Sequence, residues 1–386
     1  MYSGVMKTCS LWALLVILVW DGHPVPVQSR TESAITLNLR DYGWQLPDRH
    51  EINDPSIAVD HQGRVLVGFT VRERAGLVTR SQPSLGFRIV RFSHNGKIDL
   101  SLSLPTNAAG RTGVYLSDTD QIIARANDNL RLFQADAGNA QGGGWQMLAP
   151  CTQQCSVEQS VSRHSLRLYT PSADPPLTLI RLSPQPVLKR CGKPERLIES
   201  TDDRMQNYPR ISDELAYSSL DGNAYRWPLC DYEHRVEMPL RIGGGWVVLS
   251  DKLFVLNTLS REDNWGLAVV SSDGHPKFRP DLAKHESVLA SQPIRSSERG
   301  DRIAVDIATL RGGNRRLDIS AHATARRIAV YDVEAEKEVA SIPASVKHRY
   351  RLEFDLSPDG HRLAILEDDI VRVVDVDVAK PKLEAH

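Results

Sequence analysis

The sequence predicts an all-β fold made of one small unit repeated along the chain, and three observations support this prediction. Short apolar runs alternate with turn signals throughout the 386 residues. No segment shows the periodicity of a helix longer than about three turns. The clearest unit, residues 352–377, presents three strands in succession with their turns in place.

In this unit, Phe354 and Leu356 end a first strand, and Ser357-Pro358-Asp359-Gly360 forms a turn before strands at 363–366 and 371–376. Proline sets φ at the first central position of the turn, and Asp-Gly accepts the backbone angles of a tight reversal. The segment is therefore predicted to be a meander of three short strands.

The motif hydrophobic-x-hydrophobic-S-P-D-G-x-R-L-A-hydrophobic, followed by V-x-D-V, resembles the WD40-like repeat of secreted bacterial β-propellers of the TolB kind. The resemblance is clear only for this last repeat. It implies a propeller fold and an exported bacterial protein.

Degenerate copies of the unit occur upstream. Residues 297–305 match 357–365 at the serine, the glycine, the arginine, the shared alanine and both apolar ends, and 57–67 is a third copy. Residues 328–333 continue the second copy as its third strand, as 371–377 continue the last. Repetition of such units along a chain is typical of a propeller.

A second class of turn recurs where the third strand of a blade would lead into the fourth. Asn95-Gly96 and Asp273-Gly274 are its two examples. Counting from all these anchors predicts seven blades, with six or eight as alternatives. The expected bounds are 52–104, 112–149, 156–190, 208–242, 245–290, 294–343 and 350–380.

Closure of the ring is predicted at the N-terminal strand, residues 34–39, which stands alone before the first blade. The last blade shows only three clear strands. Pairing the isolated strand into that blade would remove both exposed edges of an open ring. The alternatives to this single propeller are a pair of β-sandwiches or a β-solenoid.

Residues 1–29 have the plan of a secretory signal peptide, with Lys7 ahead of an apolar run from Leu11 to Trp20. This run is about half the ~20 residues of a spanning helix, so a membrane anchor is the weaker interpretation. A lipoprotein is disfavoured because Cys9 precedes the run. We expect a secreted or periplasmic protein with cleavage before Arg30.

The remaining chain, residues 30–386, is expected to be one propeller domain, because no Gly/Ser linker or charge run interrupts it. A formal net charge of −1 gives no indication of a nucleic-acid partner or an anionic membrane. Hydrophobic residues make up 41% of the chain, enough for a packed core. We expect a monomer without a membrane span.

Four cysteines follow the signal segment, and an even number in an oxidising compartment predicts disulfides. Three connectivities can be drawn. The favoured one joins Cys151 to Cys155, which close a short loop at a blade boundary, and Cys191 to Cys230, which flank the next blade. A four-thiolate zinc site is the alternative, although the chain has no Cys-x-x-Cys.

No local motif of catalysis or of cofactor binding was found: the chain lacks a Gly-x-Ser-x-Gly elbow, a phosphate-binding glycine loop and His-Glu-x-x-His. We therefore expect no cofactor and no metal. His164, His234 and His285 are isolated in sequence and are interpreted as surface or structural residues. Asp118 with Asp120, like Asp375 with Asp377, is interpreted as part of a solvated turn or strand face rather than a calcium loop.

Two segments repeat the sequence Gly-Gly-Gly-Trp, at 142–145 and 243–246. Paired tryptophans could form an aromatic platform for a ligand. Their expected registers differ, however, the first being in the last strand of a blade and the second in the first strand of another. We therefore interpret both tryptophans as packing residues between blades.

Two classes of function remain, because a fold alone does not choose between them. The first is a non-catalytic exported propeller that binds a protein, peptide or glycan. The second is a propeller enzyme, such as a hydrolase, a lyase or a quinoprotein-like enzyme, with residues converging on the central channel. The absence of catalytic motifs favours binding. A convergent cluster of His, Arg and acidic side chains in the channel would favour the enzyme.

A candidate binding surface is predicted where loops between second and third strands share one side of the disc. An acidic loop, Glu367-Asp368-Asp369, lies in the blade between the two arginine-bearing loops and could be their partner in a surface ion-pair network of little energetic value. The excess of arginine instead suggests that this surface holds an anionic group of a partner or glycan. The arginines are Arg72, Arg74 and Arg80 in the first blade and Arg311, Arg315 and Arg316 in the sixth.

Overall fold

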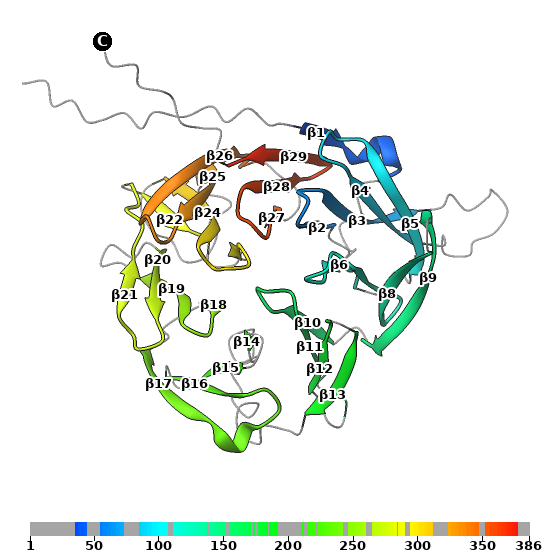
Figure 1. Ribbon diagram of the computed structural model, residues 1–386. Coiled ribbons are helices and arrows are strands. Elements are labelled where there is room, and N and C mark those ends of the chain that lie inside the picture. The colour runs from blue at the N-terminus through cyan, green and yellow to red at the C-terminus, as the bar shows by residue number, and fades with distance from the viewer. Residues whose placement is uncertain are drawn as a thin grey trace, which may run out of the picture.

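The chain folds into a ring of small antiparallel sheets, as the computed structural model shows (Figure 1). The described residues are 35–44, 55–72, 85–106, 111–136, 139–151, 155–170, 173, 177–183, 185–191, 210–211, 215–220, 223–241, 246–259, 265–283, 285–289, 294–311, 323–346 and 352–376. Within them lie seven sheets, six with four strands and one with five. The predicted all-β propeller with seven blades is thus confirmed.

Blades 1 to 4 follow one another along the chain, each with its first strand nearest the channel (Figure 1). Blade 1 contains β2 (Ser56–Val59), β3 (Val65–Arg72), β4 (Leu85–Phe92) and β5 (Ile98–Thr106). Blade 2 contains β6 (Gly113–Leu116), β7 (Ile122–Ala126), β8 (Asn129–Asp136) and β9 (Asn139–Pro150). Blade 3 contains β10 (Ser156–Gln159), β11 (Ser165–Tyr169), β12 (Leu177–Arg181) and β13 (Val187–Cys191). Blade 4 contains β14 (Arg210–Ile211), β15 (Leu215–Leu220), β16 (Asn223–Pro228) and β17 (Val236–Arg241).

Blades 5 to 7 complete the ring. Blade 5 contains β18 (Trp246–Ser250), β19 (Leu253–Leu259), β20 (Trp265–Ser271) and β21 (Pro276–Phe278). Blade 6 contains β22 (Glu286–Val288), β23 (Arg295–Ser296), β24 (Arg302–Leu310), β25 (Ala323–Asp332) and β26 (Lys337–Ala344). Blade 7 contains β27 (Glu353–Leu356), β28 (Arg362–Glu367) and β29 (Ile370–Asp375). Two short 3-10 helices are also present, η1 (Leu39–Tyr42) and η2 (Tyr232–His234).

The ring is closed by β1 (Ile35–Asn38), which pairs antiparallel with β29 as the outermost strand of blade 7. The register places Ile35 opposite Val373 and Asn38 opposite Ile370. The backbone pairing continues beyond the strand, because Leu39 N donates to Asp369 O over 2.7 Å. The prediction that an N-terminal strand completes the last blade is confirmed, and β29 has no open edge there.

Blade 6 departs from the simple four-strand pattern. Its first strand is interrupted, so that β22 pairs with residues 307–309 of β24 and β23 pairs with residues 303–304. The bounds expected from the sequence, 245–290 for blade 5 and 294–343 for blade 6, assigned residues 286–288 to blade 5, whereas β22 belongs to blade 6. The interruption was not predicted, because both pieces are short fragments in the sequence.

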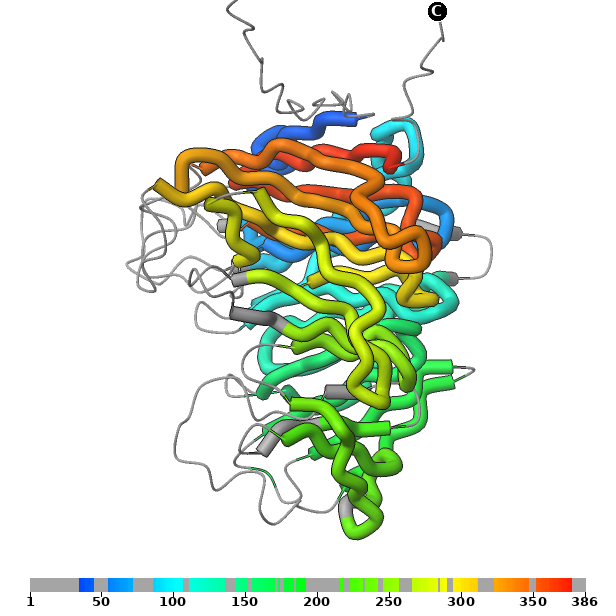
Figure 2. The backbone as a smooth tube through the Cα atoms, turned by 90° about the vertical axis from the view of Figure 1, so that its left-hand side faces the viewer, coloured from blue at the N-terminus to red at the C-terminus, as the bar shows by residue number. Residues whose placement is uncertain are grey.

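The two sides of the disc differ in the segments that they carry (Figure 2). Because strands alternate in direction, the turns between first and second strands all lie on one side, here called the turn face. The opposite side, called the loop face, carries the connections between second and third strands and those between blades. The described turns of the turn face are 60–64, 117–121, 160–164, 251–252, 297–301 and 357–361.

The core consists of apolar layers between neighbouring blades rather than one central mass. Blades 1 and 2, for example, pack Phe87 and Leu100 against Ile122 and Phe133. Burial of such side chains contributes about 25 cal/mol per Å2 of apolar surface removed from water. Because the apolar layers lie between blades, the channel is bordered by the first strands and their turns. Polar side chains can be accommodated at these positions.

The tryptophans of the repeated Gly-Gly-Gly-Trp segments pack as expected. Trp145 of β9 lies against Phe133, with ring centroids 5.3 Å apart. Trp246 begins β18, is buried, and contacts Tyr217 and Phe254. Their role in these contacts is packing between strands and blades.

Residues 1–29, the predicted signal peptide, lie outside the described residues. None of the helices in the described part of the chain has the length and apolar character needed to cross a membrane.

Candidate functional site

Five of the six described turns of the turn face share one backbone arrangement, which defines equivalent positions in different blades. Asp60 opens the turn in blade 1, and Ser117, Ser160, Ser297 and Ser357 open it in blades 2, 3, 6 and 7. In each turn the carbonyl of this first residue accepts a hydrogen bond from the backbone N–H three residues later, over 2.8 to 3.0 Å. The residue that donates this bond has a left-handed backbone.

Glycine occupies this left-handed position in blades 1, 6 and 7, as Gly63, Gly300 and Gly360. Blades 2 and 3 carry Asp120, with φ 60°, and Arg163, with φ 62°. A side chain in this conformation costs about 1 kcal/mol or more. Both side chains contact other blades, so that the strained positions supply two of the charged groups of the channel.

Arg163 reaches from blade 3 to two blades that are not its neighbours. Its Nη1 donates to Val59 O of blade 1 over 2.6 Å, and its Nη2 donates to Asp355 Oδ2 of blade 7 over 3.2 Å. The same carboxylate oxygen accepts from Val59 N over 2.8 Å. Both Arg163 and Asp355 are largely buried. The guanidinium thus lies across the turn-face end of the channel and joins blades 1, 3 and 7.

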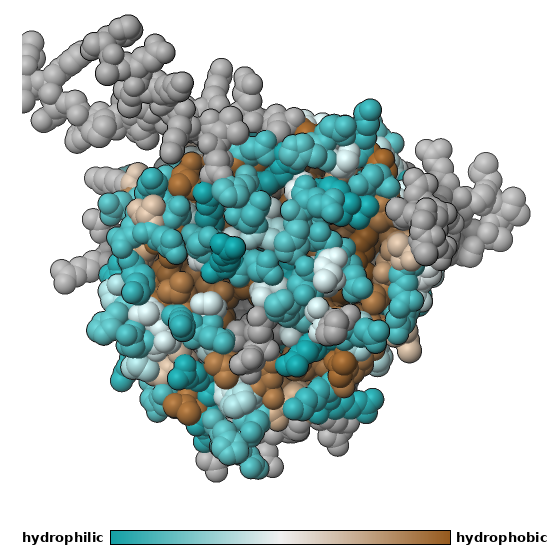
Figure 3. Space-filling view, viewed as in Figure 1, coloured by the Kyte–Doolittle hydropathy of each residue, from teal (hydrophilic) through white to brown (hydrophobic). Residues whose placement is uncertain are grey.

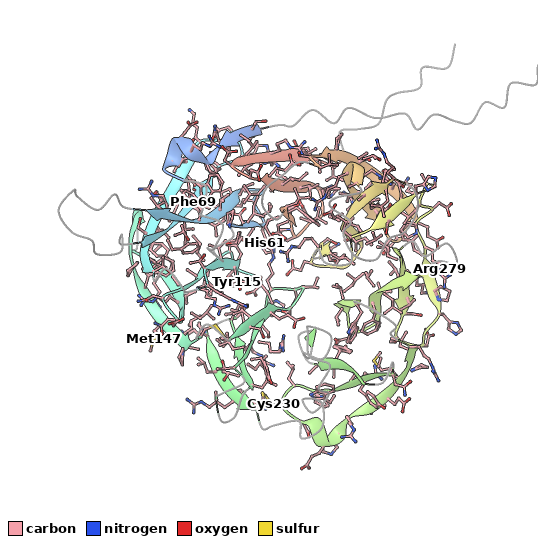
Figure 4. All side chains as sticks on the ribbon, turned by 180° about the vertical axis from the view of Figure 1, so that it is seen from behind. His61, Phe69, Tyr115, Met147, Cys230 and Arg279 are labelled. Carbon is pink, nitrogen blue, oxygen red and sulfur yellow. A yellow bond between two sulfur atoms is a disulfide. The ribbon has the colours of Figure 1, made fainter. Side chains whose placement is uncertain are left out.

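His61 makes a second connection between blades, and Figure 4 shows it on the inner side of the ring. Its Nδ1 lies 2.8 Å from Asp120 Oδ1 of blade 2, and its Nε2 lies 3.1 Å from Glu298 Oε2 of blade 6. Both ring nitrogens face carboxylates, and only the imidazolium can donate to both. Burial opposes the charged form, but the hydrogen bonds and charges of the two carboxylates outweigh it and raise the pKa of His61.

His164 agrees with its interpretation as a surface or structural residue, since its Nε2 lies 3.2 Å from Asp118 Oδ2 of blade 2. The contacts do correct one interpretation of the sequence. Asp118 and Asp120 belong to contacts between blades rather than to a merely solvated turn. His234 is as expected, since it is exposed and pairs with Asp231 of its own 3-10 turn.

The first strands add a set of polar side chains at matched positions, which the sequence interpretation missed. Two residues before the residue that opens each turn stand Tyr115 in blade 2, Glu158 in blade 3, Arg295 in blade 6 and Asp355 in blade 7. Blade 1 has Ala58 at this position. A convergent cluster of His, Arg and acidic side chains is therefore present at the channel.

Most members of this cluster have defined partners. Glu158 accepts from Arg167 Nη2 over 2.6 Å within blade 3. Arg295 donates from Nε to Phe354 O over 3.0 Å and lies within 4 Å of two carboxylates of blade 7, Glu353 at 3.8 Å and Asp355 at 3.9 Å. The cluster therefore places charged contacts along the channel, and those of Arg295 connect blade 6 with blade 7.

Tyr115 is different, because its hydroxyl forms no hydrogen bond with any described residue. Burial raises the pKa of this phenol, and the nearby guanidinium groups of Arg125, Arg295 and Arg111 oppose the shift. Burial of Arg125, together with the charge of Arg111, lowers the pKa of Arg125, and Tyr115 and Asp128 oppose this shift. The surroundings of Tyr115 are thus cationic.

The cysteines are paired in the arrangement favoured from the sequence. Cys151 and Cys155, with Cα atoms 5.2 Å apart, bridge the connection between blades 2 and 3. Cys191, at the end of β13, is bonded to Cys230 of blade 4 with Cα atoms 4.6 Å apart. In the described part of the chain, no group of three or more His, Cys, Asp or Glu side chains is arranged to hold a metal ion.

The predicted arginine surface falls largely outside the described residues, which exclude Arg74, Arg80, Arg315 and Arg316. Arg72 ends β3, and Arg311 is exposed directly after β24, so that both connections start on the loop face. The acidic residues of the β28–β29 turn have other partners. Glu367 pairs with Arg372 at 2.9 Å, and Asp369 pairs with Arg40 of η1.

No family model and no curated protein matches the sequence. Among solved structures, the chain is similar to virginiamycin B lyase from Staphylococcus aureus, with TM-score 0.48 and 11% identity over 88% of this chain and 98% of that one. It is also similar to a chain of the mitotic checkpoint complex, with TM-score 0.46 and 12% identity over 90% and 96% of the two chains. A third similarity is to Hsv2 from Kluyveromyces lactis, with TM-score 0.45 and 11% identity over 81% and 89%. The assignment of seven blades rests on the strand pairing described above.

Proposed function

We propose that this protein is an exported, non-catalytic β-propeller that binds a protein or glycan partner. The main observation in support is that the charged side chains at the turn-face end of the channel are paired with one another across blades. Arg163 and His61 each hold groups from two other blades. Side chains in such pairs hold the ring together and are poorly placed to exchange protons with a substrate.

Export is supported by two features. The N-terminal 29 residues have the plan of a signal peptide. Two disulfides, Cys151–Cys155 and Cys191–Cys230, suit an oxidising compartment. Mass measurement of the exported protein tests this part of the proposal, and a mature chain that begins near Arg30 is the expected result.

The surface proposed for the partner is the loop face around Arg72 and Arg311. Glu367 pairs with Arg372, and Asp369 pairs with Arg40. These acids thus have partners other than the predicted arginines, which supports the choice of this surface. Guanidinium groups suit carboxylates, sulfates and phosphates through paired hydrogen bonds. An anionic group of the partner is therefore expected here. Figure 3 shows the disc from the side seen in Figure 1, where the surface is mainly hydrophilic, with smaller hydrophobic areas between polar ones.

The test compares the wild-type protein with the triple variant Arg311→Ala, Arg315→Ala, Arg316→Ala on an array of sulfated, carboxylated and neutral glycans. The variant is expected to melt at nearly the wild-type temperature and to lose salt-dependent binding to the anionic members. A matched control is Arg279→Ala, which removes an exposed arginine at the outer rim of blade 5 (Figure 4). Equal capture by the triple variant and the wild type would remove this surface from the proposal.

A propeller enzyme is the second candidate, and the matched channel positions of Tyr115, Glu158, Arg295 and Asp355 favour it. Converging acid, base and hydroxyl groups are what a hydrolase or lyase needs. Turnover of any glycan that the array retains, abolished by Asp355→Asn with the fold intact, would replace the binding proposal with this one.

A further inference from the structure

Blade 2 carries a cationic site at the inner end of its sheet, beside Tyr115. The central residues of the site, Arg111, Tyr115 and Arg125, take no part in the described contacts of Arg163 and His61. They come from the connection that leads into β6, from β6 itself and from β7, and Figure 4 shows Tyr115 on the inner side of the ring. The inference drawn from it rests on the proposed binding function and identifies the kind of group that is bound.

The backbone places the side chains of this site together. Gly113 and Arg125 are directly opposite in the pairing of β6 with β7. Tyr115, two residues further along β6, points to the same side of the sheet as Gly113. A Cβ atom on Gly113 would lie 3.4 Å from the Tyr115 hydroxyl oxygen. The hydroxyl therefore lies over the space left by this glycine, on the side of the sheet that carries Arg125.

Three arginines act on the Tyr115 hydroxyl, while Asp128 acts on Arg125 with the opposite sign. Arg125 is only 5% exposed, and Arg111 is near enough to lower its pKa further. Arg111 itself is exposed and forms no ion pair with any described residue. Arg295 of blade 6 adds a third guanidinium that acts on the Tyr115 hydroxyl. Each charged group that affects this hydroxyl is an arginine.

One polar group at the site, the Tyr115 hydroxyl, has no hydrogen-bond partner among the described residues. A hydroxyl that is removed from water without gaining a hydrogen-bond partner destabilises the folded protein. An oxyanion would accept hydrogen bonds from hydroxyl and guanidinium groups and would offset the like charges.

The acids next to Arg295 indicate what the rest of the ligand is. Glu353 and Asp355 lie 3.8 and 3.9 Å from this guanidinium and present acceptors beside the cationic site. Acceptors of this kind suit the hydroxyl groups of a sugar, whereas they repel a second anionic group. Arg163 lies across the channel at the turn face. Arg111 precedes β6, which runs toward the turn face, so Arg111 stands on the loop face. The partner surface is proposed on that same face.

We propose that the inner end of blade 2 binds the carboxylate or sulfate of an acidic sugar residue. The Tyr115 hydroxyl donates a hydrogen bond to the oxyanion, and Arg111, Arg125 and Arg295 supply the positive charge. Glu353 and Asp355 accept hydrogen bonds from the sugar hydroxyls. This proposal names a binding site and involves no chemical step.

The probes are a sulfated heparin disaccharide, its desulfated form, which keeps the uronate carboxylate, and lactose as the neutral sugar. Isothermal titration in a buffer free of sulfate and phosphate measures each Kd. The wild-type protein is expected to bind one or both acidic disaccharides and not lactose. The desulfated form separates the two sources of oxyanion, since its binding shows that the carboxylate suffices.

Two conservative variants test the residues. Tyr115→Phe removes only the hydroxyl and is expected to weaken binding about tenfold, as the loss of one hydrogen bond to a charged group does. Arg111→Gln is expected to weaken it about threefold and to reduce its dependence on salt. Arg279→Gln, at the outer rim, is the matched control and should bind as the wild type does. Unchanged melting temperatures show that the variants fold.

The outcomes separate this inference from the proposed function. Binding that is unaffected by Tyr115→Phe and Arg111→Gln but lost in the Arg311, Arg315, Arg316 variant overturns the blade 2 site and leaves the binding function standing. Binding that depends on Tyr115, together with turnover of the disaccharide, keeps the site and overturns the non-catalytic function. Tighter binding of a glutamate-rich peptide than of either acidic disaccharide overturns the choice of a sugar.

Discussion

The junction between blades 6 and 7 and the junction between blades 3 and 4 are built from different interactions. Between blades 6 and 7, aliphatic and aromatic side chains from both sheets form one buried layer that includes Ile328, Phe354 and Ile365. Between blades 3 and 4, the described apolar cluster consists of Leu177, Leu179 and Cys191, with Leu229 and Cys230 packed against it.

The difference suggests how a ring of repeated sheets tolerates unequal blades. The first strand of blade 4, β14, has only two residues, whereas β27 of blade 7 has four. A shorter sheet buries less apolar surface against its neighbour and gains less from the hydrophobic effect. At that junction the Cys191–Cys230 bond adds a covalent link. The described residues of the 6–7 junction form no disulfide, and hydrogen bonds such as those from Arg295 Nε to Phe354 O and from Arg302 Nη1 to Gly360 O supplement its packing.

The largest effect is expected from removing the closing strand. Deletion of residues 34–39 takes away the pairing of β1 with β29 and the buried Leu39, so that blade 7 regains an open edge. A loss of at least about 4 kcal/mol in the free energy of unfolding is expected from the lost hydrogen bonds and apolar burial. An unaltered thermal melt of the deletion variant would show that closure is not provided by this strand.

A truncation in each junction compares their packing directly. Phe354→Ala in the 6–7 layer is expected to cost about 3 to 5 kcal/mol, because it leaves a large cavity in a fully buried layer. Leu179→Ala in the 3–4 cluster should cost about 2 kcal/mol, at the low end for such a change, since the described part of the chain places fewer apolar side chains around it. Urea unfolding measures both. Equal losses would contradict the difference between the two junctions.

Removal of the disulfide tests the covalent link. The paired change Cys191→Ser, Cys230→Ser should lower the free energy of unfolding by about 2 to 4 kcal/mol, because the bond closes a loop with a sequence separation of 39 residues. The paired change Cys151→Ser, Cys155→Ser, with a separation of 4, should cost less, about 2 kcal/mol by the same relation. Non-reducing peptide mapping of the wild type confirms the bonds, and four free thiols or bound zinc in exported protein would refute them.

The smallest effect is expected from the charged contact across the channel. The pKa of His61 is raised in the folded protein, so the stability that the imidazolium contributes is complete below the unfolded pKa of about 6.5 and is lost as pH rises through the folded pKa. The contribution should stay below about 1 kcal/mol, because His61 is partly exposed and its charges are screened.

The measurement is the difference in unfolding free energy between wild type and His61→Gln at pH 5.5 and at pH 8.5. The difference is expected to shrink at the higher pH. A double-mutant cycle with Glu298→Gln provides the control, since the shared part of the effect should vanish in that background. A difference that grows with pH would show that His61 is neutral in the fold.

Much of the fold could be predicted because its signals are local. Turn residues such as Pro358 and Gly360 define where strands end, and the isolated strand at 34–39 identifies the place of closure. Short-range alternation cannot show interruption of a first strand, so the break between β22 and β23 was missed. The position of the cysteines at blade boundaries favoured one disulfide pairing, although cysteine spacing alone left three connectivities open.

The channel cluster could not be predicted, because its members are distant in sequence and the turns of blades 2 and 3 lack the glycine that identifies the others. Arg163 and Asp355 are 192 positions apart, and His61 and Glu298 are 237 apart. A signal was nevertheless present. Ser117 and Ser160 open turns like Ser297 and Ser357, and aligning the blades on them brings Tyr115 and Glu158 to the positions of Arg295 and Asp355.

The pairing of β1 with β29 also determines when the molecule can finish folding. Ile35 leaves the ribosome early, but its partner Val373 is synthesised 338 positions later (373 − 35). Until then the chain is an open series of blades, and its longest-range contact has to be made last. Such distant contacts slow folding. A chain that crosses a membrane with its N-terminus first therefore carries its closing strand out ahead of the blade that the strand completes.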